Sequence, residues 1–507
     1  MSNIKIGWAS RILTDDGPVD MPGQAYERIS QGVIDDITST ALVLDDGKDS
    51  VIFLSVDLGG FRYGLVDLIR QKAKAIDPEI PVEKIVPGAT HTHSSLSYWD
   101  DDFPFTAGDE KMEVNIDIVS PSKTRDRITT AMAEMVAEAW ANRCEGGVGY
   151  GYGYAVAAHS RRVCYFDDVS KRPGQGNGLN TYAVNGHSVM YGNTNDDNFS
   201  HYEAGADHFI NLFYTFDKSG KLTGAIVNVP CPSQNTEHSD GLTADYWADV
   251  RKAIRAKHGD IFILPQCAAA GDLSPRILHY KKAQERRFRL KYDFDSLSKL
   301  ADPIEQCARR DIAERISEAF DEVLSWAKTD IHTEMPIAHG VSTIDLPRRM
   351  ITEEEYEFCK AGYAESLKAQ FHTGGDPMAD FKANTTICSN RRRFMNILKR
   401  YEIQKENPTI PMELHVLHVG DIAFASNRFE LYMDFQHRMQ ARSPFEQTFI
   451  IQLAGQPGDE GGTYLSTERG YQGKGYSASM FCNQVSYEGG QVIVEETVKR
   501  LKELYNK

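Results

Sequence analysis

The chain has 507 residues, of which 41% are hydrophobic and 25% charged, so it can bury a large core and is not an intrinsically disordered protein. Its 72 acidic and 56 basic residues give a formal net charge of -16, which repels phosphate backbones and excludes nucleic acid as an expected partner. No stretch reaches the roughly 18 uninterrupted apolar residues of a membrane span, and the N-terminus lacks a secretory-signal pattern, so we expect a cytoplasmic protein.

The first third of the chain alternates strand and helix patterns. Residues 51–57 form a β-branched run, residues 65–75 have helical spacing, and residues 84–89 form a second apolar run that ends at turn residues. This order predicts an α/β layer architecture. Residues 125–142 place their apolar side chains on one helical face. The glycine-rich residues 147–154 alternate at period two without G-x-G-x-x-G spacing, which favours a strand over a nucleotide loop.

Further along, strand patterns are separated by two charge-rich stretches. Residues 225–229 and 260–264 are typical of buried strands, and residues 414–425 predict a hairpin that turns at glycine 420. Residues 280–328 and 352–406 are helical in pattern and carry no Pro/Gly/Ser linker.

We therefore predict a single α/β unit over residues 1–507. It should have a mixed central β-sheet flanked by helices, a site at the strand ends, and helical insertions at about 280–328 and 352–406. The chain ends in a helical pattern over residues 491–504.

Two histidines follow the apolar run that ends at residue 89, in the phrase Thr90-His91-Thr92-His93-Ser94. Residues i and i+2 of an extended strand point to the same face, so both side chains would border one site if the extended geometry continues. One histidine could then bind a metal ion while the other serves catalysis. The alternative for each is an ordinary loop histidine.

A second motif follows the predicted strand at 260–264. It reads Gln266-Cys267-Ala268-Ala269-Ala270-Gly271-Asp272-Leu273-Ser274-Pro275. Small neighbours would let a substrate approach the Ser274 hydroxyl closely. The motif lacks the G-x-S-x-G elbow of common serine hydrolases, and a serine before proline in a turn often has a structural role, so both interpretations stay open.

These segments, in this order, resemble the neutral (non-lysosomal) ceramidase family. The family phrase T-H-T-H-S appears at residues 90–94, and G-D-V-S-P appears as G-D-L-S-P at residues 271–275. Near the C-terminus, residues 420–424 lead to Asn427-Arg428-Phe429-Glu430, where the family has a metal-binding glutamate, and the family's tyrosine pair corresponds to Tyr464 and Tyr476. The resemblance covers the catalytic domain, without the family's C-terminal immunoglobulin-like domain.

The resemblance implies the roles of individual residues. His91, Glu430 and Tyr464 would hold a metal ion, expected to be zinc, although another divalent metal would also suit. Such an ion polarises a scissile carbonyl and activates water or a hydroxyl group. Catalytic roles fall to four more residues: His93 and Tyr476 stabilising an oxyanion, Ser274 as nucleophile or orienting group, and Arg161 contacting substrate.

The family's second histidine ligand is missing. The corresponding phrase reads Val229-Pro230-Cys231-Pro232-Ser233-Gln234, and the nearest candidates are Cys231 and His238. We favour His238 as the replacing ligand. The alternatives are a site of altered metal identity or affinity, and a site without metal.

The leading hypothesis is a metal-dependent hydrolase of an amide, ester or glycoside bond in a small soluble substrate. The polar and aromatic residues 177–202 suit a sugar-like or amide ligand. A true neutral ceramidase that cleaves N-acyl sphingoid lipid is the first alternative. A non-catalytic member that binds a ligand is the second.

Overall fold

The computed structural model describes residues 3–15, 17–102, 105–107, 110–114, 116–173, 186–458 and 462–506. The largest element is an eight-stranded sheet. Its strands are β1 (Lys5–Ile12), β4 (Thr38–Asp45), β5 (Ser50–Val56), β6 (Ile85–Ala89), β9 (Cys144–Tyr154), β14 (Phe209–Asp217), β15 (Leu222–Val229) and β16 (Phe262–Cys267). They lie in the order β16-β15-β14-β9-β1-β4-β5-β6. The β5–β6 and β15–β16 pairs are parallel and the others antiparallel, so the predicted mixed sheet is confirmed.

The two halves of this sheet face each other. Strands β1 and β9 pair over only two residue pairs, at Lys5 and Ile6. The Trp8 ring of β1 stacks on Phe262 of β16, with ring centroids 5.5 Å apart and 3° between the planes. Both faces of the inner strands are therefore covered, which explains why all seven residues of β5 are buried.

A second sheet packs with one face against both halves, and the sequence did not predict it. It contains β18 (Ile337–Pro347), β19 (Thr409–Val419), β20 (Ile422–Ser426) and β22 (Gln447–Ile451), in that order. Phe424 of β20 contacts Phe53 of β5 and Phe213 of β14, with ring centroids 4.8 and 6.1 Å apart. The predicted hairpin turn lies between β19 and β20, where Gly420 has a φ of 59°.

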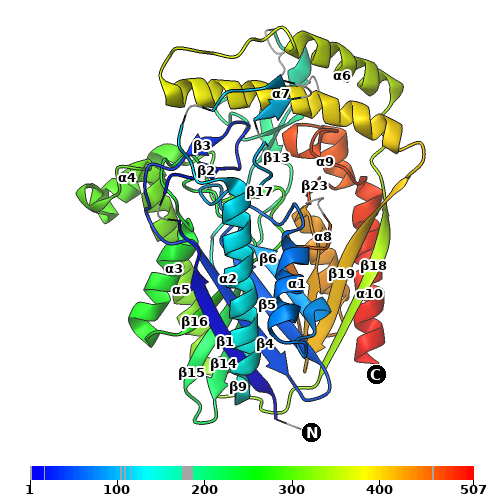
Figure 1. Cartoon of the computed structure of the whole chain (residues 1–507). Helices are drawn as coiled ribbons and strands as arrows, with labels where there is room; N and C mark the ends of the chain where they lie inside the picture. The colour runs from blue at the N-terminus through cyan, green and yellow to red at the C-terminus, as the bar shows by residue number, and fades with distance from the viewer. Residues whose placement is uncertain are drawn as a thin grey trace.

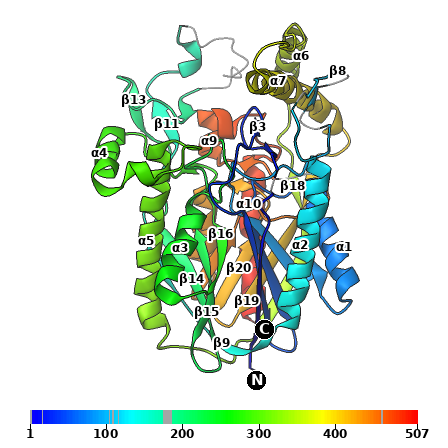
Figure 2. The same ribbon diagram turned by 60° about the vertical axis from the view of Figure 1, so that its left-hand side comes forward.

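Helices cover the outer faces of both sheets. Helices α1 (Leu65–Ile76) and α2 (Pro121–Ala141) bury their apolar sides against β4 and β5, while α3 (Tyr246–His258) and α5 (Pro303–Ala327) cover β14 and β15. Figure 2 shows these two helix pairs on opposite sides of the strands. Helices α8 (Met433–Arg442) and α10 (Tyr487–Tyr505) pack on the four-stranded sheet. The α/β class with flanking helices is confirmed.

The two predicted insertions contain helices of different kinds. In residues 280–328, α4 (Lys281–Lys291) is largely exposed, whereas α5 buries Ile316, Phe320 and Val323 against the sheet and forms part of the core. In residues 352–406, α6 (Glu353–Ser366) and α7 (Pro377–Ile403) cross one end of the molecule, far from both termini (Figure 1). Of the helices that the structure describes, none has a stretch long and apolar enough to span a bilayer.

The remaining elements are short, and several of them, including β2, β3, β13 and α9, lie toward the end of the molecule that α7 crosses (Figure 1). They are β2 (Asp20–Met21), β3 (Arg28–Ile29), β7 (Thr106–Ala107), β8 (Glu110–Lys111), β10 (His159–Ser160), β11 (Arg162–Tyr165), β12 (Ser188–Met190), β13 (Phe199–Tyr202), β17 (Leu273–Ser274), β21 (Glu430–Leu431), β23 (Tyr464–Leu465) and α9 (Glu468–Gly473). Four single turns of 3-10 helix, at Val82–Lys84, Val169–Lys171, Phe294–Ser296 and Tyr476–Ala478, complete the described elements.

Candidate functional site

The candidate site is built by loops that leave the ends of several strands. His91 lies just after β6, Gln234 follows β15, and Gly271 follows β16. Glu430 opens β21, which pairs in parallel with β23 so that Glu430 is opposite Tyr464. Residues that are far apart in sequence therefore meet at one end of the two sheets.

His91 has an unusual backbone conformation. Strand β6 ends at Ala89, and His91 has a φ of 67°, in the left-handed region. The extended geometry that we expected through His93 is therefore interrupted. The His91 and His93 rings nevertheless lie side by side, with centroids 4.9 Å apart and an angle of 79° between planes.

In the His91 imidazole, the nitrogen that can accept a hydrogen bond faces a carboxylate. Its Nδ1 lies 2.6 Å from the carbonyl oxygen of Gly59, so Nδ1 is the donor and Nε2 carries the lone pair when the ring is neutral. Nε2 is buried, has no hydrogen-bond partner among the described residues, and lies 3.1 Å from Oε2 of Glu430. Two acceptors at this distance repel each other unless a proton or a metal ion lies between them.

Glu430 is ionised in this environment. Burial would raise the pKa of its carboxyl group, but His91 in its protonated form, the charge of Arg161 and a hydrogen bond from Tyr464 lower the pKa to about 2. Burial raises the pKa of the Tyr464 phenol well above its ordinary value, against the opposing effect of Arg161. The site therefore pairs a carboxylate with a neutral phenol in the absence of a metal ion.

Arg161 is fully buried beside this pair. Its Nη2 donates to the Tyr464 hydroxyl at 3.1 Å and to the carbonyl oxygen of Gly271 at 2.9 Å, and lies 3.5 Å from Oε2 of Glu430. Gly271 is small for a packing reason, because a Cβ atom there would lie 2.3 Å from the carbonyl oxygen of Glu430. The small residues of this loop thus allow two backbones to approach each other.

The residues present fit a zinc ion in type. Imidazole, carboxylate and phenol oxygen are zinc ligands, and the unsatisfied Nε2 of His91 is the buried polar atom that a metal would explain. Among the described residues, however, no three His, Cys, Asp or Glu side chains gather as a metal-binding group, so His91 and Glu430 acquire no third ligand of these types.

The predicted replacement ligand, His238, does not join His91 and Glu430. Its side chain is 51% exposed, and its Nε2 lies 3.9 Å from Oε1 of Glu237. The turn that carries it is fixed by Asp245, which accepts from the Thr236 backbone N–H at 2.7 Å, and this turn directs Glu237 inward. Cys231 is also turned away, with its Sγ 3.2 Å from the carbonyl oxygen of Ala157.

A cavity of about 800 Å³ opens beside the site. His93, Arg161, Tyr464 and Tyr476 are among the residues that line it, and Tyr476 is 40% exposed. Both predicted insertions contribute to its wall. The further lining residues include Gln24, Met190, Tyr191, Gln234, Glu237, His238, Arg276, Ile277, Leu278, Lys281, Ile304, Glu305 and Arg393. Of the polar segment 177–202, residues 177–185 lie outside the described residues, while Met190 and Tyr191 border the cavity.

Ser274 is not at the cavity surface. It is 0% exposed, lies on β17 opposite His159, and is not among the residues that line the cavity. Its Oγ accepts a hydrogen bond of 3.1 Å from the backbone N–H of Arg276. The structure thus gathers His91, His93, Arg161, Glu430, Tyr464 and Tyr476, and leaves Ser274 and His238 outside that group.

Sequence reasoning missed three polar residues of the site. Gln234 donates its amide to Nε2 of His93 at 2.8 Å, and Glu237 lies 3.2 Å from Nδ1 of the same ring. Arg276 in turn contacts Glu237. The only sequence signal was position, because Gln234 closes the phrase in which the family's histidine is missing.

Comparison with known proteins shows that the fold of this chain is similar to that of solved ceramidase structures. The structure of neutral ceramidase from Pseudomonas aeruginosa matches with a TM-score of 0.65 and 16% identity, over 99% of this chain and 75% of that one. The fold is that of neutral ceramidases. A ceramidase structure described as complexed with C2 matches with a TM-score of 0.64 and 15% identity, over 100% of this chain and 76% of that one. No family model and no curated protein sequence matches the chain.

Proposed function

We propose that the chain is a zinc-dependent hydrolase that cleaves an amide, ester or glycoside bond in a small hydrophilic substrate. The observation that carries the proposal is the 3.1 Å contact between Nε2 of His91 and Oε2 of Glu430, beside Tyr464 and behind a cavity of about 800 Å³. His91, Glu430 and Tyr464 would hold the metal ion. When bound, it would polarise a carbonyl oxygen and acidify a water molecule.

The chain's own residues supply the rest of the chemistry. Arg161 places a fixed positive charge beside Glu430 and Tyr464, where negative charge develops when a carbonyl is attacked. Tyr476 lies next to Tyr464, with ring centroids 5.9 Å apart, and presents its phenol to the cavity as a further donor. The hydroxyl of Ser274 is buried, so its role in catalysis is tested below with a variant.

The cavity wall supports a substrate with polar groups. Gln24, Gln234 and Asn235 offer amide donors and acceptors, and Tyr191 offers a ring face with a hydroxyl. One side of the wall is apolar, at Ile277, Leu278, Ile304 and Met190. That side supports the second candidate function, hydrolysis of an N-acyl sphingoid lipid, as does the likeness to ceramidase structures.

A substrate panel separates the two functions. Purified protein loaded with zinc would be assayed on short-chain N-acyl amino acids, N-acetylated sugars, simple glycosides and a dispersed N-acyl sphingoid lipid. We expect turnover of a hydrophilic substrate at least tenfold faster, as kcat/KM, than of the lipid. Preference for the lipid would favour the second function, and no turnover of any by the zinc-loaded protein would favour the non-catalytic alternative.

A further inference from the structure

A hydrogen-bond chain determines which nitrogen of His93 carries the proton. The Arg161 guanidinium can only donate, and its Nη1 lies 3.2 Å from the Gln234 side chain, so the Gln234 carbonyl oxygen faces Arg161. The amide nitrogen of Gln234 then faces Nε2 of His93 at 2.8 Å. An amide nitrogen can only donate, so Nε2 of His93 must accept. The remaining proton of the neutral ring therefore lies on Nδ1.

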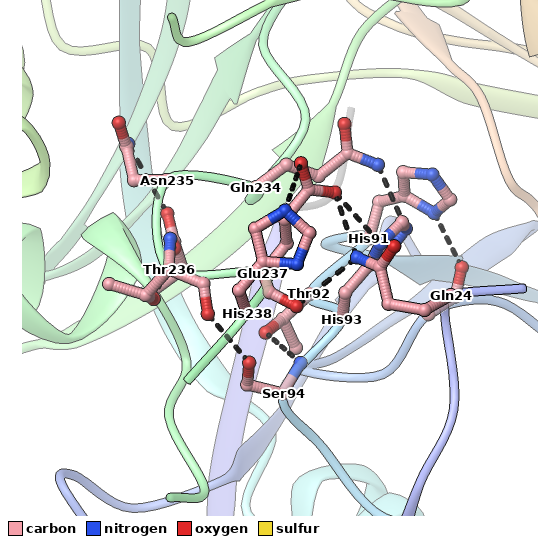
Figure 3. Close-up of polar contacts among 12 residues, drawn as sticks. Gln24, His91, Thr92, His93, Ser94, Gln234, Asn235, Thr236, Glu237 and His238 are labelled. Carbon is pink, nitrogen blue, oxygen red and sulfur yellow. Dashed lines mark hydrogen bonds and ion pairs between the residues drawn. The ribbon is translucent and has the colours of Figure 1, made fainter. Parts of the chain in front are cut away.

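The Glu237 carboxylate lies beside that proton. Its Oε2 lies 3.2 Å from Nδ1 of His93 as an ion-pair contact, and the buried Nδ1 has no hydrogen-bond partner among the described residues, so Glu237 is the acceptor beside it. Figure 3 shows the Glu237 carboxylate between Gln24 and the His93 ring. Gln24 donates to the same carboxylate oxygen at 3.3 Å, and Arg276 pairs with the other.

The carboxylate is itself held in place. Arg276 also donates to Glu305 at 2.9 Å and to the carbonyl oxygen of Asn235 at 3.1 Å, so its guanidinium is fixed on three sides. Burial would raise the pKa of Glu237, but His93 and Arg276 outweigh it and hold the pKa below its ordinary value. With 8% exposure, Glu237 is a buried, ionised and fully oriented group.

We propose that Glu237 is a positioning residue for His93: it fixes the imidazole with its proton on Nδ1 and presents Nε2 to the cavity as a proton acceptor. The inference rests on the proposed hydrolase function for its chemical consequence, but not for its geometry. An imidazole in this tautomer cannot donate from Nε2 to an oxyanion. His93 thus acts as the base of the site, and the oxyanion falls to Arg161 and Tyr476.

The step that this arrangement serves balances for an amide or ester. Water displaces the Gln234 amide from Nε2 of His93, and its O–H proton passes to Nε2 as its oxygen forms a bond to the carbonyl carbon. The same proton then passes to the leaving nitrogen or oxygen as the bond from that atom to carbon breaks. One water is consumed, and His93 returns to its starting form with Glu237 ionised throughout.

The tautomer can be measured without any substrate. Protein labelled with ¹⁵N-histidine would be examined by long-range ¹H–¹⁵N correlation, with the His93 signals assigned from their loss in His93→Asn. We expect the Nδ1–H pattern in the wild type. An Nε2–H pattern would overturn the proposal whether or not the protein hydrolyses anything.

Variants then test whether Glu237 determines this tautomer of His93. In Glu237→Gln, the new carbonyl oxygen must face Arg276, so the NH₂ group takes the position of Oε2, where it faces Nδ1 of His93, and the Nδ1–H pattern should be lost. Gln234→Met should keep the pattern, because Glu237 still receives the proton. Glu285→Gln is the matched control, since this cavity-wall carboxylate pairs with Arg289 and should leave the pattern unchanged. Retention of the wild-type pattern in a folded Glu237→Gln protein would overturn the proposal.

Kinetic measurements test the effect of Glu237 on catalysis. Glu237→Gln should lower kcat by about 10²- to 10⁴-fold with little change in KM, and Glu237→Asp should restore part of the loss because it keeps the carboxylate. Equal losses in Glu237→Asp and Glu237→Gln would contradict a positioning carboxylate. A protein that shows the Nδ1–H pattern and loses it in Glu237→Gln, yet hydrolyses nothing, would uphold the geometry and refute the hydrolase function.

Discussion

Zinc binding should stabilise the folded chain, and Glu430→Gln should remove most of that effect. A ligand at one hundred times its Kd stabilises the native state by about 2.7 kcal/mol. An unfolding entropy of about 2.1 cal/mol/K per residue gives about 1.1 kcal/mol/K for 507 residues, so Tm should rise by about 2.5 °C. The amide of Glu430→Gln is a poor zinc ligand, and hundredfold weaker binding leaves a shift of about 0.4 °C.

The assay is thermal unfolding of protein stripped with EDTA and dialysed, with and without zinc chloride, together with elemental analysis of protein that never met a chelator. Glu413→Gln is the matched control, because Glu413 also contacts a histidine, His415, at 2.9 Å but lies elsewhere in the fold. It should keep the wild-type shift. No zinc-dependent shift in the wild type, or the same shift in Glu430→Gln, would refute the reasoning, as would the absence of stoichiometric metal.

Two further outcomes follow from buried groups. Ser274→Ala removes the acceptor for the Arg276 N–H, so it should lower the free energy of unfolding by about 1 kcal/mol and lower kcat less than tenfold. A fall in kcat of several orders of magnitude at unchanged Tm would support Ser274 as the nucleophile. For Glu413, hydrogen bonds from His415 and Arg70 outweigh burial and lower the pKa from 4.5 to about 2. The ionised carboxylate therefore stabilises the folded protein by at most about 3 kcal/mol, and this contribution is fully present above pH 4.5. The stability difference between wild type and Glu413→Gln should shrink as pH falls from 4.5 toward 2, and a difference constant over that range would contradict this cause.

Local patterns were enough to predict the main elements of the fold. The apolar periodicity of residues 65–75 and 125–142 corresponds to α1 and α2, and the run before residue 90 corresponds to β6. The second sheet was missed because β18 mixes buried and exposed residues irregularly. The role of α5 was also missed, since its charged residues suggested an outlying helix while its apolar side packs on β14.

The site was only partly predictable for a similar reason. His91, Glu430 and Tyr464 belong to phrases whose residue types are recognisable in the sequence, and the fold brings them together. Glu237 and Gln234 are ordinary polar residues of a loop. Their importance comes from contacts with His93, more than 140 residues away, and no local pattern encodes such a contact.

Two buried His–Glu pairs, His91–Glu430 and His415–Glu413, show what distinguishes a candidate metal ligand from a structural histidine. In the second pair, Nδ1 of His415 lies 2.9 Å from Nε2 of His339, and Nδ1 of His339 has only a long contact of 3.2 Å to a backbone carbonyl. Nε2 of His415 in turn forms a hydrogen bond of 2.9 Å to Oε1 of Glu413, so both nitrogens of each ring in this pair of histidines have hydrogen-bond partners. In His91, the 2.6 Å bond to Gly59 commits the only proton of the neutral ring to Nδ1. The ring nitrogens beside Glu413 thus all have hydrogen-bond partners, whereas Nε2 of His91, beside Glu430, has none among the described residues and is the nitrogen that an added cation would satisfy.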